Sequence, residues 1–250
     1  MINKRIIIFV FFTSIAHADD FNCQKYNYEL ANNWLCSHLD RGIHKTRLPD
    51  SILSDKTDID LKTIKRIEAL VSQAELLHEE ENYIKAEQNY RQIVKNHFSY
   101  APGWIKFSQF YSAMDRDHDA LQILQQGLLK IPDNADIYHE TGLVQVRLRL
   151  VPQAVISLAK AAVKAPENVH YSYVYGIALN STRRPYKAID VLQQAHKRQP
   201  ENIEILEALF LISQDLEQHN KALLFARKIQ EIDPDNDSIQ HYMIESKVIE

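Results

Sequence analysis

The chain has 250 residues, of which 45% are hydrophobic and 25% charged, and its formal net charge at pH 7 is −4. A mildly acidic chain is not expected to bind nucleic acid, because that binding depends on clustered Lys and Arg that neutralise phosphates. The sequence also lacks a glycine-rich phosphate loop, a nucleophile elbow and a Cys-x-x-Cys-His haem motif. We therefore expect a non-catalytic protein without a cofactor.

The N-terminus has the pattern of a cleavable export signal. Lys4 and Arg5 precede an apolar run over 6–15, and the small residues of Ala-His-Ala follow at 16–18. The apolar run is about half of the roughly 20 residues that a membrane-spanning helix needs. This pattern predicts a signal peptide over 1–18 and a periplasmic mature chain that is not stably inserted in the membrane. A retained membrane anchor is the alternative.

Residues 19–66 are predicted to form an N-terminal helical segment and a linker, and they contain both cysteines, Cys23 and Cys36. An oxidising compartment favours a disulfide between them, which would contribute about 3 kcal/mol. The chain must turn between the two residues, because one continuous helix would separate the sulfurs by about 20 Å. Two free thiols are the alternative.

The rest of the sequence repeats every 34 residues. Five alanines keep this interval: Ala86, Ala120, Ala154, Ala188 and Ala222. Four prolines keep it as well: Pro132, Pro166, Pro200 and Pro234. The repeat divides the chain into five units, 67–100, 101–134, 135–168, 169–202 and 203–236, followed by a predicted capping helix over 237–250. A period of this length indicates helix pairs that must stack on one another to bury their apolar faces.

In four of the five units, a small residue at the eighth place and alanine at the twentieth predict that the two helices approach closely, as for Gly142 and Ala154, whereas the fifth unit has Phe210 at its eighth place. The second unit carries the fullest pattern: Trp104, Phe107, Tyr111, Ala120, Leu124, Gly127 and Pro132. This pattern resembles the tetratricopeptide repeat (TPR). The resemblance implies an all-α, right-handed superhelix of about five antiparallel helix pairs, whose inner wall comes from the first helix of each pair.

One group of aspartates suggests a calcium site, but the residues around it do not have the pattern of a calcium-binding loop. Asp115, Asp117 and Asp119 alternate as in a calcium-binding loop. Ala120 and Gln126, however, stand where such a loop needs its glycine and its bidentate glutamate. We interpret the three aspartates as a solvated turn between paired helices, and we expect no metal site.

The resemblance also implies where a partner would bind, namely at the second, fifth, ninth and twelfth places of each first helix. The predicted protein-binding groove contains Ile105, Gln109, His139, Leu143, Val146, His170, Tyr173, Ile177, Asn180, Glu207 and Leu211. Apolar residues that line a concavity are costly unless a partner covers them, so an extended peptide or an amphipathic helix is the expected ligand. The alternative is that these side chains only pack between adjacent units.

The carboxylate clamp of chaperone-binding family members is absent, because Val71, Glu75, Asp136 and Glu140 occupy places where that clamp has Lys, Asn or Arg.

Residues 171–236 are similar to the repeat tails of exported multihaem cytochromes. The leading hypothesis is a periplasmic scaffold that holds a partner protein during assembly of an envelope or respiratory complex. The alternative is a permanent structural subunit that binds through its convex face or its N-terminal segment.

Overall fold

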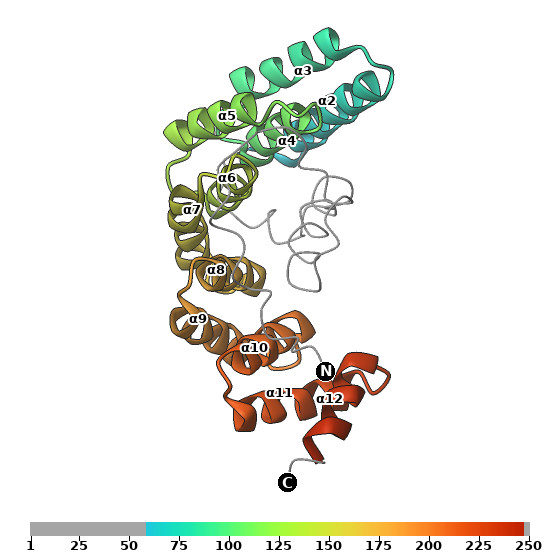
Figure 1. The fold of residues 1–250 in the computed structure, drawn as a ribbon. Coiled ribbons are helices and arrows are strands. Elements are labelled where there is room, and N and C mark those ends of the chain that lie inside the picture. Colours follow the sequence, from blue (N-terminus) through green and yellow to red (C-terminus); the bar gives the residue numbers. More distant parts are fainter. Residues whose placement is uncertain (1–58, 248–250) are drawn as a thin grey trace. The chain divides into compact units, whose positions relative to one another are not determined.

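The computed structural model describes residues 59–247, which belong to one compact unit of the chain and form eleven helices and no strand (Figure 1). The helices are α2 (Leu61–Glu79), α3 (Tyr83–Asn96), α4 (Ala101–Ser112), α5 (Asp117–Lys130), α6 (Ala135–Arg147), α7 (Val151–Lys164), α8 (Val169–Ser181), α9 (Pro185–Arg198), α10 (Ile203–Asp215), α11 (His219–Ile232) and α12 (Asp237–Lys247). The predicted all-α fold of stacked helix pairs is confirmed. The predicted signal peptide and the two cysteines lie outside the described residues.

Asparagines between the helix pairs start the helices that follow them. The side-chain oxygen of Asn134 accepts a hydrogen bond from the backbone N–H of Ile137 over 2.8 Å. Asn202 caps α10 in the same way through the N–H of Ile205, over 3.1 Å. Such caps satisfy one of the four backbone donors that a helix start leaves without a partner. The Pro-x-Asn sequence therefore marks the boundary between pairs, although Asn168 makes no such side-chain cap at the start of α8.

The turn inside every helix pair contains a non-glycine residue in the left-handed backbone region, with φ between 56° and 60°. These residues are Glu81, Asp115, Arg149, Arg183 and Glu217. In the last of these turns, the N–H of Gln218 donates to the carbonyl of Ser213, and the N–H of Glu217 donates to the carbonyl of Gln214, both over 2.9 Å. This is the Schellman arrangement, in which glycine is the favoured residue.

We expect Glu217→Gly to stabilise the protein by about 0.5 to 1 kcal/mol, because a left-handed conformation costs an L-residue about 1 to 2 kcal/mol and the entropy lost by glycine offsets part of that gain. Glu217→Ala is the control, since alanine loses the same charge but keeps the strain. Urea denaturation of the three proteins measures the difference. Equal midpoints for the glycine and alanine variants would show that the turn stores no strain.

Glycines lie where the two helices of a pair meet. A Cβ built on Gly142 would come within 2.6 Å of Leu158 Cγ, and one on Gly176 within 2.8 Å of Leu192 Cγ. The sequence predicted Ala154 as the residue opposite Gly142, but the three nearest atoms all belong to Leu158, one turn further along α7. The glycine accommodates a large leucine, so close approach does not require small residues on both helices.

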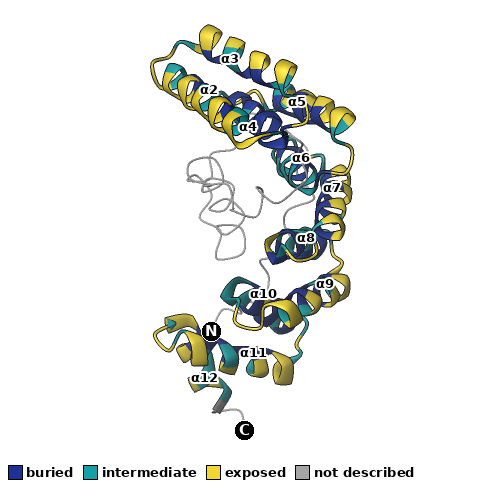
Figure 2. Cartoon of the chain, turned by 180° about the vertical axis from the view of Figure 1, so that it is seen from behind, coloured by how far each residue is buried: buried dark blue, intermediate teal, exposed yellow. Residues whose placement is uncertain are grey.

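The first helices of neighbouring pairs also contact one another, α2 with α4, α4 with α6, and α8 with α10. In the part of the chain that the structure describes, no two second helices have contacts of that extent. Figure 2 shows buried residues where helices face each other and exposed residues along the outer sides of the second helices. Side chains of these neighbouring first helices are therefore close enough to contact one another, whereas α6 and α8 approach each other less closely. None of the helices in 59–247 combines the length and apolar character that a bilayer span requires.

Candidate protein-binding surface

The eleven residues of the predicted groove lie on α4, α6, α8 and α10, and we call the surface that they share the first-helix face. Their exposure differs widely. Leu211 is 42% exposed, whereas Tyr173 and Ile105 are only 3% and 6% exposed. For these last two residues the burial agrees with the alternative reading, in which they pack within the array. Neither can serve as an anchor for a partner without a rearrangement of the helices.

Three aliphatic residues occupy the same place on successive first helices. Leu143 on α6 and Ile177 on α8 are partly buried, and Leu211 on α10 is exposed. Val146 and Asn180 stand one turn later on α6 and α8, and both are partly buried. The first-helix face thus presents an aliphatic row that runs across three helix pairs.

Imidazole and phenol rings border this row on α6 and α8. The ring of His139 stacks on that of Tyr171 with a centroid distance of 4.5 Å and an interplanar angle of 26°. The ring of His170 meets His139 edge-on at 5.5 Å. Tyr171 donates a hydrogen bond to Asp136. Tyr171 was missed by the sequence analysis, because its place in the unit is not one of the four that the resemblance assigns to the inner wall.

Burial holds His139 in its neutral form. It lowers the pKa of His139 to about 3, and the nearby His170 contributes in the same direction. The Nδ1 atom of His139 is buried and has no hydrogen-bond partner within the described structure. At pH 7 this residue therefore acts as a packing group rather than as a charge.

Two glutamates on first helices have a raised pKa, and burial is the main cause in both. For Glu140 on α6, the positive charge of Arg147 and a hydrogen bond from Gln109 act in the opposite direction. For Glu207 on α10, only a hydrogen bond with Asn236 opposes burial, while the acidic neighbours Glu204 and Asp233 raise the pKa further. The α10 end of the face is consequently rich in negative charge. His170 Nδ1 lies 3.9 Å from Glu204 Oε2.

Two of the three aspartates that resembled a calcium loop, Asp117 and Asp119, make contacts with arginines. Asp117 accepts a hydrogen bond from Arg147 Nε over 2.8 Å, and Ser112 Oγ joins the same network. Asp119 forms an ion pair with Arg116 over 2.8 Å. Residues 59–247 contain no group of three or more His, Cys, Asp or Glu arranged to hold a metal. Asp117 therefore joins α5 to α4 and α6, whereas Asp119 pairs with the N-cap residue of its own helix.

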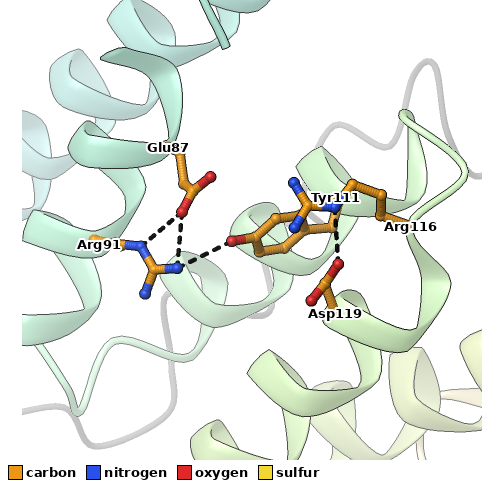
Figure 3. Close-up of polar contacts among 5 residues, drawn as sticks. All are labelled: Glu87, Arg91, Tyr111, Arg116 and Asp119. Carbon is orange, nitrogen blue, oxygen red and sulfur yellow. Dashed lines mark hydrogen bonds and ion pairs between the residues drawn. The ribbon is translucent and has the colours of Figure 1, made fainter. Parts of the chain in front are cut away.

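Figure 3 shows a second polar cluster, on α3, α4 and α5, that joins the first two helix pairs. Arg91 Nη2 donates to Tyr111 Oη over 3.2 Å, and Arg91 also pairs with Glu87 over 2.7 Å. The guanidinium of Arg116 lies 4.6 Å from the centroid of the Tyr111 ring. Burial is the main cause of the raised pKa of Tyr111, so its hydroxyl stays protonated at neutral pH. No residue predicted for partner binding takes part in this cluster.

No family model matches the sequence, and no curated protein is significantly similar to it. Among solved structures, YrrB, described as a TPR protein with an unusual peptide-binding site, is 19% identical with a TM-score of 0.55. The match covers 72% of this chain and 96% of YrrB. A MamA structure is 15% identical, with a TM-score of 0.57 and coverage of 69% and 94%. MamA from Desulfovibrio magneticus RS-1 is also 15% identical, with a TM-score of 0.56 and coverage of 68% and 97%. These similarities show the fold, which is that of a TPR solenoid.

Proposed function

We propose that this protein is an exported, non-catalytic scaffold whose first-helix face binds a partner protein or peptide during assembly of an envelope or respiratory complex. The aliphatic row of Leu143, Ile177 and Leu211 carries the proposal, because it runs over three helix pairs and keeps part of its apolar surface, above all Leu211, open for a partner to cover. The description of YrrB as having a peptide-binding site supports the same reading for a related fold.

We expect Leu211→Ala to weaken partner capture by about 1 kcal/mol or more, the usual cost of removing a buried anchor from an interface. The matched control is Leu224→Ala on α11, which removes a leucine that is 52% exposed from the second helix of the same unit. Pull-down from an envelope fraction, with circular dichroism of each variant, measures the effect. Equal capture by both folded variants would contradict binding at the first-helix face.

Export is proposed from the pattern of residues 1–18. We expect the purified mature chain to begin at Asp19 and to carry an oxidised Cys23–Cys36 pair. Intact mass before and after reduction measures both features. A chain that keeps its first eighteen residues would contradict cleavage, and full thiol labelling before reduction would contradict the disulfide.

The second candidate function is that of a permanent structural subunit that binds through its second helices. Leu129 on α5 and Val163 on α7 are 82% and 77% exposed and hold the same place in adjacent units, and Ile156 on α7 is 58% exposed. If Val163→Glu abolishes capture while Leu211→Ala leaves it intact, this second surface is the interface.

A further inference from the structure

The first-helix face differs in charge along its length, and this difference points to the chemistry of its partner. Glu207 on α10 lies one helical turn before Leu211, so a ligand that covers the leucine also reaches the carboxylate. Within residues 59–247, no basic side chain forms an ion pair with Glu207. Its partial burial and, to a smaller extent, its acidic neighbours Glu204 and Asp233 raise its pKa, and these two neighbours add to the negative charge of the site.

The distance between neighbouring first helices favours a ligand in the polyproline II conformation. Packed helices lie about 8 to 10 Å apart, and α8 and α10 are in direct contact. A polyproline II segment advances about 3.1 Å per residue with three residues per turn, so its every third side chain falls on one face at intervals of about 9 Å. Such a segment can place one side chain beside Leu211 and the third residue before it beside Ile177. A β-strand fits this interval less well, because the side chains on one of its faces recur about every 6.8 Å.

We propose that the first-helix face binds an extended partner segment with aliphatic side chains at every third residue, followed by a lysine or arginine that pairs with Glu207. This proposal rests on the proposed function, because it assumes binding at the same surface. The aliphatic side chains cover Ile177 and Leu211. The basic residue supplies the positive charge that the α10 end lacks, and an acidic segment is excluded by repulsion from Glu207 and Glu204.

Two fluorescein-labelled nine-residue peptide amides test the proposal. Both have valine at the first, fourth and seventh positions with proline and serine between them, and they end in two arginines or in two glutamates. Fluorescence anisotropy with the chain from residue 19 onward should give the basic peptide at least tenfold tighter binding. A third peptide, with its three valines adjacent and two arginines at its end, should bind at least fivefold more weakly than the first.

Three variants assign the effect to Glu207. Glu207→Gln should weaken binding of the basic peptide at least fivefold while preserving an oxygen for Asn236, and Glu207→Lys should reverse the preference between the two peptides. Glu201→Gln, which removes an exposed glutamate in the turn before α10, should change neither affinity. Circular dichroism melts show whether each variant is folded.

Equal affinities for the basic and acidic peptides, a preference for the acidic peptide, or binding of neither peptide would overturn this inference. If Leu211→Ala still reduces partner capture in that case, the proposed function stands and only the chemistry of the ligand is wrong. If neither Leu211→Ala nor Leu224→Ala affects capture, the proposed function itself has failed.

Discussion

Replacing Gly142 by alanine is expected to destabilise the protein by about 1 to 3 kcal/mol, although alanine is favoured over glycine within a helix by about 1 kcal/mol. The added Cβ would lie 2.6 Å from Cγ and 2.7 Å from Cδ2 of Leu158. Leu158 is 1% exposed, so it is enclosed by protein and cannot move out into solvent. The two helices of the pair must separate or the leucine must leave its preferred rotamer, and either change costs more than the helix propensity of alanine contributes.

Gly142→Ala should stabilise the protein rather than destabilise it when Leu158 is also replaced by a smaller residue. Leu158→Ala alone should cost about 2 to 5 kcal/mol, because it leaves a cavity in the core. In that background, Gly142→Ala should stabilise the protein by up to about 1 kcal/mol, since the clash is gone and the gain in helix propensity remains. A double-mutant cycle from urea denaturation measures the coupling. Additive effects would show that Leu158 is not the residue that requires glycine at 142.

Acidification is expected to destabilise the protein through His139. The folded chain keeps this imidazole neutral down to about pH 3, whereas the unfolded chain protonates it below about pH 6.5. Between these two values the unfolded state binds more protons, so the free energy of unfolding falls as the pH falls. From pH 6.5 to pH 5 the loss should be about 1 to 2 kcal/mol, given about 1.4 kcal/mol for each full pH unit.

His139→Phe isolates this contribution, because phenylalanine can still stack on Tyr171 but does not titrate. Buried carboxyl groups such as Glu207 and Asp215 have raised pKa values and act in the opposite direction, but they are present in both proteins and cancel in the comparison. The free energy of unfolding of the wild type should fall by about 1 to 2 kcal/mol more than that of the variant between pH 6.5 and pH 5. Parallel curves would mean that His139 has the same pKa in the folded and the unfolded chain.

The stacked helix pairs could be predicted because the same pattern of residues recurs every 34 residues in all five units. A single misplaced residue does not obscure a period that five alanines share, and the Pro-x-Asn sequence marks the boundaries between pairs. The partner of Gly142 could not be predicted in the same way. Which residue of α7 meets it depends on how the helices cross, and the period does not determine that angle.

For the candidate site as well, the repeat predicts on which side of the array a residue lies but not how exposed that residue is. The repeat places Tyr173 and Leu211 on the same side of the array, but Tyr173 is almost fully buried and Leu211 is exposed. Exposure depends on the packing of each helix against its neighbours, which varies from unit to unit with the size of individual side chains. The stacking of Tyr171 on His139 joins two units, so no pattern within one unit could have revealed it.

The strained turns have a further consequence for recognition, because all five left-handed residues are charged. Along the chain their signs run negative, negative, positive, positive, negative: Glu81, Asp115, Arg149, Arg183 and Glu217. Glycine would relieve the strain at each position but would erase this order. Helix pairs of similar backbone geometry would otherwise offer several equivalent registers to a partner that contacts only these turns. Unequal charges at equivalent turns make those registers electrostatically distinct. A large partner that contacts several of these turns can therefore distinguish one end of the array from the other.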